Sequence, residues 1–428
     1  MRPSLSKAAR INRRSVAAVQ TAIVFAFFFL AQGCASPRVT PLVFPTAILT
    51  TPTPNPEPTF DLPVKPTVIR TVMPSLTPET QPSATASPKL SPTPTSPSGV
   101  EVQRNGSSFV LLVNGQPTIV RGMNYNVNYT NLPEETQWKL HRRDFQILRE
   151  AGVNMVIGWG IYDEITLRVA EDYDIGVIMP FELDPESAFE NKDYQDQVKS
   201  EFREYITRFR GFPAVWGWNP GGDELLYRMR TEKHRTNDKL QVAANLELEL
   251  VALAHSLDPS HIIVVKEPRD WFIKYLGAAL EEPSTQPGFQ DLNRSLVYGV
   301  NVYGRFDDID MTLRNARQTL NSQLGLAMMV TEFGPFNSPP ADRPADYAGI
   351  WDIVSEISNF GGCAYAFGPD QPNPGVKNPY DPLTLLPSEY SLVDMNGTPV
   401  DDSLAALAAK WLPLTTPTLA PSLTPTLN

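Results

Sequence analysis

The central part of the chain alternates short apolar segments of strand length with longer amphipathic segments. The stretch 144–152 shows the helical type, with an apolar stripe and a glycine at its end. Nearly continuous apolar strands separated by helices are typical of a parallel sheet buried on both faces. Eight such units predict an α/β fold, a closed (β/α)8 TIM barrel. The predicted strands are 118–123, 153–158, 175–180, 214–218, 262–265, 297–302, 327–331 and 363–367.

A short hairpin precedes the first predicted barrel strand. Residues 102–120 read as two or three strands around turns at Asn105-Gly106 and Asn114-Gly115. Asn-Gly pairs favour the tight turns of β-hairpins. We expect this N-terminal β-hairpin to close the floor of the barrel.

Proline is concentrated outside the central part. The chain has 428 residues and 42 prolines, and 16 of these prolines lie between positions 37 and 97. Proline lacks a backbone donor and restricts its predecessor, so residues 35–99 are predicted to form a disordered, extended stalk. A second Pro/Thr tract, 414–428, predicts a disordered tail. Residues 100–413 remain for the barrel domain, and a barrel typically needs about 250 residues.

Residues 1–34 have the organisation of a bacterial export signal. Five basic residues lie between positions 2 and 14, an apolar stretch covers about 16–31, and Leu30-Ala31-Gln32-Gly33-Cys34 follows. This end resembles a lipoprotein lipobox, which implies that Cys34 carries lipid and becomes the mature N-terminus. An uncleaved membrane helix with its positive end inside is the alternative. Both interpretations place the rest of the chain at the extracellular face of the cell membrane.

The charge balance and the few cysteines and histidines argue against several classes of function. The net charge is −11 and no run of Lys or Arg follows the N-terminal segment, so no nucleic-acid partner is expected. The two cysteines, Cys34 and Cys363, cannot build a disulfide framework, and Cys363 is predicted to fill core space. The four histidines lack metal-ligand spacing. We therefore expect neither a metal nor a cofactor.

Polar and aromatic side chains gather where the predicted strands end. In a (β/α)8 barrel, chemistry collects at the C-terminal ends of the strands. Carboxylates there suit acid–base or nucleophilic chemistry, amides bind hydroxyl groups, and aromatic rings can stack on sugar faces. The candidate site residues are Arg121, Asn124, Trp159, Glu182, Asp223, Glu224, Glu267, Asn301, Tyr303, Glu332 and Phe367.

Glu224 and Glu332 each follow a short apolar strand, 214–218 and 327–331. On a barrel, both carboxylates are expected at the same rim. Such a pair can act as the acid/base and the nucleophile of a retaining glycosidase when the carboxyl groups lie about 5–5.5 Å apart. A separation of about 6.5–9.5 Å would favour inversion instead. We expect the shorter separation.

Several segments in a fixed order resemble the glycoside hydrolases of clan A. They are NGQP at 114–117, RGMN at 121–124, WNPGGDE at 218–224, VTEFG at 330–334 and YSLVDMNGTPV at 390–400. Within the clan, the chain is most similar to the β-1,3-glucanosyltransferase, family-2 and family-5 barrels. The resemblance spans roughly residues 100–411. It implies that Glu224 is the acid/base and Glu332 the nucleophile.

The other candidates are expected around this pair. Tyr303 should lie near the nucleophile, and Arg121 should either orient Glu332 or form a purely structural salt bridge with it. Trp159 and Phe367 are candidate sugar platforms, and Glu182 and Glu267 are weaker candidates for substrate contact. The predicted substrate-binding residues are Arg121, Asn124, Trp159, Asp223, Asn301, Tyr303 and Phe367.

The chain departs from the pattern of the family at several points. Asp223 stands where the family has an Asn that holds the substrate 2-hydroxyl, and one additional residue separates Trp218 from Asp223-Glu224. Phe367 is nearest to the place of a Trp that closes the eighth strand in the family. The active-site histidines of family-5 enzymes have no clear counterparts.

These features predict an extracellular, membrane-tethered retaining glycosidase or transglycosylase that acts on a β-linked glycan by double displacement. The expected partner is an oligo- or polysaccharide, and the barrel is expected to be monomeric. The alternative is a catalytically weak carbohydrate-binding surface protein that kept the barrel, and Asp223 is the feature that favours it.

Overall fold

The computed structural model describes residues 99–412, apart from 107, 161, 269, 271, 282–291, 293, 372, 374 and 377–381. The predictions made for the signal or anchor (1–34), including Cys34, for the stalk and for the C-terminal tail lie outside the described residues. Within the described part, no helix has the length and apolar character that crossing a membrane requires.

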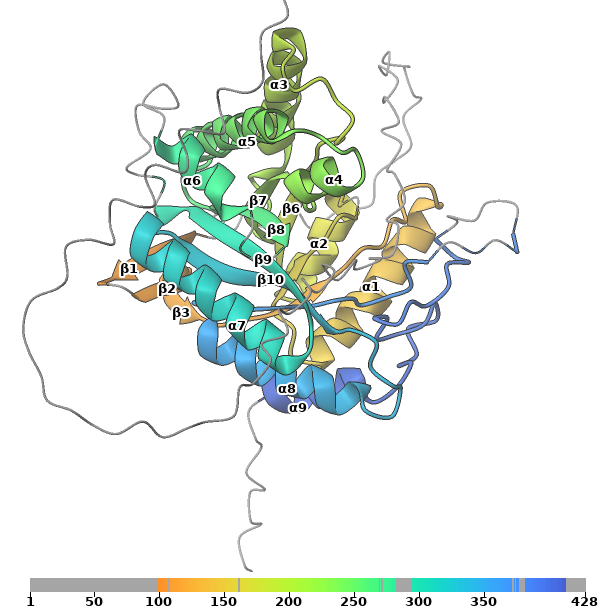
Figure 1. Ribbon diagram of the computed structural model, residues 1–428. Coiled ribbons are helices and arrows are strands. Elements are labelled where there is room, and N and C mark those ends of the chain that lie inside the picture. Colours follow the sequence, from red (N-terminus) through yellow and green to blue (C-terminus); the bar gives the residue numbers. More distant parts are fainter. Residues whose placement is uncertain are drawn as a thin grey trace, which may run out of the picture. The chain divides into compact units, whose positions relative to one another are not determined.

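Eight parallel strands form a closed barrel, with helices around it (Figure 1). Neighbouring strands follow the order β10-β11-β4-β5-β6-β7-β8-β9, and β9 pairs with β10 to close the ring. The predicted (β/α)8 barrel is confirmed. The strands are β4 (Val120–Asn124), β5 (Met155–Ile157), β6 (Gly176–Glu182), β7 (Val215–Gly221), β8 (Ile262–Pro268), β9 (Leu296–Gly304), β10 (Ala327–Pro335) and β11 (Gly361–Ala364).

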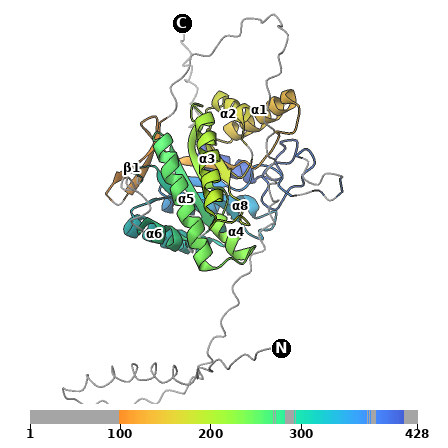
Figure 2. The same ribbon diagram turned by 90° about the horizontal axis from the view of Figure 1, so that it is seen from above.

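Helices cover the outside of the barrel, and α3 and α5 lie side by side on its outer surface (Figure 2). The sequence continues from α7 into a π-helical segment, η2, which leads to β10. The helical elements are α1 (Glu134–Glu150), α2 (Glu164–Asp172), α3 (Lys192–Phe209), α4 (Leu225–Thr231), α5 (Asn237–Leu257), α6 (Ile273–Glu281), α7 (Phe306–Arg317), η2 (Gln318–Leu324), α8 (Arg343–Ile357) and α9 (Ser403–Trp411).

The segment before the barrel is a three-stranded antiparallel sheet of β1 (Val100–Asn105), β2 (Ser108–Val113) and β3 (Gln116–Thr118). Its buried Phe109 and Leu111 join the apolar cluster inside the barrel. The backbone N–H of Val100 also donates to the carbonyl of Ser260, just before β8 (2.7 Å). The expected hairpin therefore does cover the N-terminal end of the barrel.

Side-chain alternation decides what each strand offers to the barrel interior. In β8, Ile262 and Val264 belong to the interior cluster, and Lys266 is the next residue on the same face. Cys363 is buried in the same cluster, as predicted, and burial raises the pKa of its thiol. The eighth strand was predicted too far along the chain. It was expected at 363–367, and β11 ends at Ala364.

Candidate active site

The carboxyl groups of Glu224 and Glu332 meet at the C-terminal rim of the barrel. Glu224 follows β7, and Glu332 lies in β10. One carboxylate oxygen each of Asp223, Glu224 and Glu332 lie within 4.8 Å of one another. Glu224 is 3 % exposed and Glu332 is 1 % exposed. Two residues 108 positions apart in the sequence thus form a close, nearly enclosed pair.

A tight turn after β7 places Asp223 and Glu224. Gly221 and Gly222 have positive φ values of 90° and 77°, and Glu224 follows at φ 51° in the left-handed region. A Cβ on Gly222 would lie 2.4 Å from the carboxyl carbon of Glu182, and residues other than glycine rarely adopt its φ of 77°. The left-handed backbone of a glutamate costs on the order of 1–2 kcal/mol. Strained residues of this kind cluster at functional sites.

Glu182 and Glu267 hold this turn from both sides, a structural role that differs from the predicted substrate contact. Glu182 Oε1 accepts a hydrogen bond from the backbone N–H of Asp223 (3.0 Å). The carboxylate of Glu267 accepts from the backbone N–H groups of Leu226 (2.6 Å) and Tyr227 (3.1 Å), in the first turn of α4. First-turn N–H groups have no partner within their helix, so a carboxylate there stabilises it.

Lys266 connects the proposed nucleophile to Asp223, and the sequence-based reasoning missed it. Its Nζ donates to Glu332 Oε1 (2.6 Å) and lies 2.8 Å from Asp223 Oδ1. The ammonium is buried together with both partners. Three carboxylates and one ammonium therefore share this space.

Asn124 and Asn301 lie in the site, as predicted, and belong to a chain of hydrogen bonds. Asn301 Nδ2 donates to Glu224 Oε1 (2.8 Å), and its Oδ1 accepts from the hydroxyl of Thr331 (2.8 Å). Asn124 Nδ2 donates to the backbone carbonyl of Thr331 (2.9 Å). This chain fixes the orientation of the Glu224 carboxyl group relative to β9 and β10.

Tyr303 contacts the proposed nucleophile, as predicted. Its hydroxyl donates to Glu332 Oε2 over 2.5 Å. Burial first, and then the charge of Glu332, raise the pKa of Tyr303 well above its ordinary value. The phenol therefore remains a hydrogen-bond donor. Both oxygens of Glu332 are thus engaged, one by Tyr303 and the other by Lys266.

Arg121 does not reach Glu332, and this prediction is wrong. Val120 faces the barrel interior and Asn124 reaches the site, so Arg121 points to the opposite side of β4. Its Nε donates to the backbone carbonyl of Gly152 (3.0 Å). Burial, and next the charge of Arg149, lower the pKa of Arg121. Because Arg121 points away from the site, it also does not form the purely structural salt bridge with Glu332 that was the alternative expectation.

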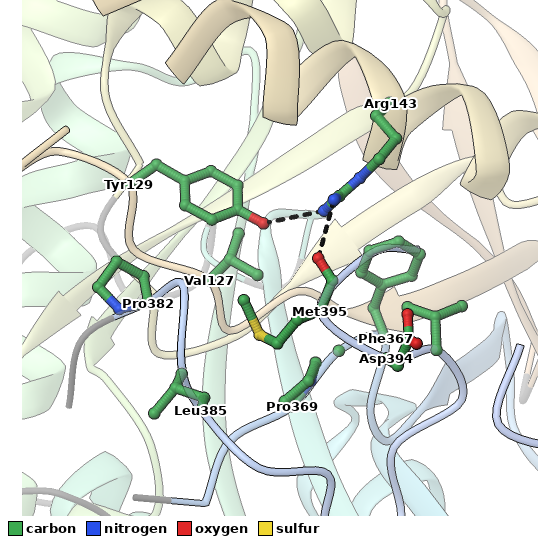
Figure 3. A pocket seen from close by; sticks show the side chains of 11 residues that line it. Val127, Tyr129, Arg143, Phe367, Pro369, Pro382, Leu385, Asp394 and Met395 are labelled. Atoms are coloured by element: carbon green, nitrogen blue, oxygen red, sulfur yellow. Dashed lines mark hydrogen bonds between the residues drawn. The ribbon is translucent and has the colours of Figure 1, made fainter. Parts of the chain in front are cut away.

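Phe367 is buried in the hydrophobic core, which corrects its predicted role as a sugar platform. Its ring packs 5.6 Å from that of Tyr125. It also lines a cavity of about 10 Å³ in which Arg143 donates to the carbonyl of Met395 and to Tyr129 (Figure 3). That volume is near the lower limit for one water molecule, so no sugar ring fits.

The aromatic residue after β11 that adjoins the site is Tyr365. Its ring is 6.0 Å from that of Tyr303, and Tyr390 packs against both rings. Burial raises the pKa of Tyr365 most, the charges of Asp370 and Glu332 raise it further, and Trp159 acts in the opposite direction. The partly exposed Trp159 therefore lies near this cluster. Tyr365 directly follows the apolar segment that forms β11, and this position at a strand end could have indicated it as a site residue.

Comparisons with known proteins agree with this architecture. No protein-family model and no curated protein matches the chain. Among solved structures, a β-glucuronidase from Bacteroides uniformis matches with a TM-score of 0.55 at 16 % identity, over 72 % of this chain and 37 % of that chain. A β-D-glucuronidase from Dictyoglomus thermophilum matches with a TM-score of 0.53 at 16 % identity, over 73 % and 54 %.

A GH2 β-galacturonidase from Eisenbergiella tayi, bound to galacturonate, matches with a TM-score of 0.52 at 16 % identity, over 73 % of this chain and 54 % of that chain. The chain thus spans about a third to a half of the length of these three structures. At this identity the likeness establishes the fold. The described domain has the (β/α)8 barrel that these glycosidases contain.

Proposed function

We propose that this protein is a retaining glycosidase or transglycosylase that acts on a β-linked glycan. The observation that carries the proposal is the approach of Glu224 and Glu332 at one rim of the barrel, with carboxylate oxygens within 4.8 Å. This spacing supports double displacement, for which the carboxyl groups lie about 5–5.5 Å apart, because inversion needs room for a water molecule between them.

The reaction then proceeds in two steps. In the first, Glu332 attacks the anomeric carbon while Glu224 protonates the departing glycosidic oxygen. In the second, Glu224 removes a proton from water or from an acceptor hydroxyl, which attacks the anomeric carbon and releases Glu332. The hydrogen bonds of Tyr303 to Glu332 and of Asn301 to Glu224 hold both carboxyl groups in position.

The similar structures indicate which substrates should be tested first. They are described as β-glucuronidases and as a β-galacturonidase bound to galacturonate. We therefore place β-linked uronides at the head of a panel of aryl β-glycosides and polysaccharides.

The decisive experiment measures turnover and stereochemistry together. The full-length protein is incubated with the panel, and NMR identifies the anomer that is released first. Retention of the β configuration is expected, with Glu332→Ala as the inactive control. Release of the α-anomer would contradict the double displacement.

Two observations favour a second candidate, a carbohydrate-binding surface protein with little or no turnover. Glu224 and Glu332 are 3 % and 1 % exposed, so a sugar ring reaches them only if covering groups move. Glu332 is also ion-paired with Lys266, which lowers its nucleophilicity. Binding of a glycan by calorimetry, without product over prolonged incubation, would establish this candidate.

The tether is proposed from the sequence alone. Cys34 carries lipid, and the Pro/Thr stalk presents the domain at the extracellular face of the membrane. Labelled fatty acid should enter the wild type and not Cys34→Ala. Equal absence of label would favour the uncleaved helix.

A further inference from the structure

Lys266 is a buried ammonium with two carboxylate partners. It is 1 % exposed, and its Nζ lies 2.6 Å from Glu332 Oε1 and 2.8 Å from Asp223 Oδ1. It projects from β8 above the interior residues Ile262 and Val264. Burying a charge is costly unless it is paired, so Lys266 needs a partner in every state of the enzyme.

The two partners differ during the proposed reaction. Glu332 is an anion in the free enzyme and becomes a neutral ester when it bonds to the anomeric carbon. Asp223 takes no part in that bond and keeps its charge. The turn at Gly221 and Gly222 holds Asp223 in place, and its backbone N–H is bonded to Glu182. Asp223 can therefore remain the counter-ion of Lys266 after Glu332 has lost its charge.

We propose that Lys266 is a catalytic residue of the second step and that Asp223 is its permanent counter-ion. This inference rests on the proposed function. In that step, water or an acceptor hydroxyl forms a bond to the anomeric carbon and gives its proton to Glu224. The bond between the anomeric carbon and the Glu332 oxygen breaks, and its electron pair returns to Glu332. Lys266 stabilises this returning negative charge, which makes Glu332 a better leaving group.

The same ion pair has the opposite effect on the first step. Lys266 stabilises the Glu332 anion of the free enzyme more than the transition state in which that charge is being lost. Removing the ammonium should therefore leave the first step intact or faster and slow the second step. The covalent intermediate would then accumulate, so kcat and KM would fall together while kcat/KM is retained.

The test uses Lys266→Met and the double variant Asp223→Asn with Lys266→Met. The single variant leaves two carboxylates uncompensated in a buried site and is expected to lower Tm. The double variant removes both charges and should recover most of that Tm. Lys410→Met is the matched control, because Lys410 pairs with Asp352 on the surface. The substrate is the aryl β-glycoside that the wild type hydrolyses fastest.

The double variant is expected to show a kcat lower by at least about tenfold and a kcat/KM within about threefold of the wild type. Stopped flow should show a burst of released phenol. Intact-mass analysis should show the protein carrying one glycosyl group. Lys410→Met should show none of these changes.

A loss of kcat and kcat/KM in equal proportion, without burst or adduct, would overturn the role of Lys266 in the second step. If the single variant does not fold, the double variant alone decides between these results. Failure of the proposed function looks different, because the wild type itself would then turn over no glycoside.

Discussion

Glu267 Oε1 accepts a 2.6 Å hydrogen bond from the backbone N–H of Leu226, the second residue of α4. Its other carboxylate oxygen accepts from the N–H of Tyr227 (3.1 Å). Glu224 immediately precedes this helix turn, and its own N–H donates to the carbonyl of Lys266 (3.2 Å). Two residues of β8 therefore position the proposed acid/base. The carbonyl of Lys266 binds the N–H of Glu224, and the carboxylate of Glu267 binds the first turn of the helix that follows.

Glu267→Gln should disturb this arrangement, because an amide has only one acceptor oxygen and places an NH2 group against an N–H. We expect a loss of about 1–3 kcal/mol of stability from the unsatisfied donor. We also expect kcat to fall by about tenfold for substrates with poor leaving groups, and less for activated aryl glycosides. Glu186→Gln, at an exposed position, is the control. Equal losses on both kinds of substrate would argue against a role through Glu224.

The division of labour between the two carboxylates can be separated by the leaving group. Glu332→Ala should abolish turnover on every substrate. Glu224→Ala should cost about 10²–10⁴-fold on natural glycans, and least where the leaving group is already acidic and needs little protonation. Steady-state kinetics on a series of aryl glycosides of graded acidity measures this dependence. The assignment is wrong if both variants lose the same factor across the series.

Glu247 should make the protein less stable as the pH rises. This α5 residue is buried beside Gly221, and burial raises its pKa to about 8. Because the folded pKa lies above the unfolded value of 4.5, the stabilising effect is complete below pH 4.5 and is lost as the pH rises towards 8. The loss is on the order of 5 kcal/mol. Glu247→Gln should flatten Tm between pH 5 and 8, and an unchanged slope would contradict the assignment.

His141 should produce the opposite dependence at lower pH. Its ring bonds to the hydroxyls of Tyr125 (2.9 Å) and Thr166 (3.2 Å), and burial lowers its pKa from 6.5 to about 4. Its contribution to stability is therefore present above pH 6.5 and is lost as the pH falls towards 4. The amount is about 3 kcal/mol. Chemical denaturation at pH 7, 5.5 and 4.5 should show a smaller decline for His141→Gln than for the wild type.

The predicted fold and the predicted position of the carboxylate pair have a common basis in local sequence. Apolar strand segments alternate with amphipathic helices, and both patterns depend on neighbouring residues. Once eight parallel strands close, their C-terminal ends share one rim, so Glu224, Asn301, Tyr303 and Glu332 could be brought together without knowledge of any contact. The additional residue between Trp218 and Asp223 could also be recognised in the sequence. The left-handed backbone conformation of the turn that contains it could not.

The failures concern the direction in which a side chain points. Strands of a parallel barrel are apolar on both faces, so the sequence does not show whether Arg121 faces the interior or the helices. For the same reason the sequence did not show that Lys266 faces the interior. The aromatic contact was assigned to Phe367 instead of Tyr365 because the eighth strand was predicted to end at position 367, whereas β11 ends at Ala364. One residue of register moves a side chain to the other face.

The sequence by itself determined the barrel, its hairpin floor and the rim at which the carboxylates lie, because these follow from periodicity and chain order. Only the tertiary structure decided that Lys266 pairs with Asp223 and Glu332, and that Glu182 and Glu267 hold the turn before α4. Those contacts join residues far apart in the chain. They depend on strand register, on which face of each strand points into the barrel and on the exclusion of water around buried charge, and a local pattern does not show these.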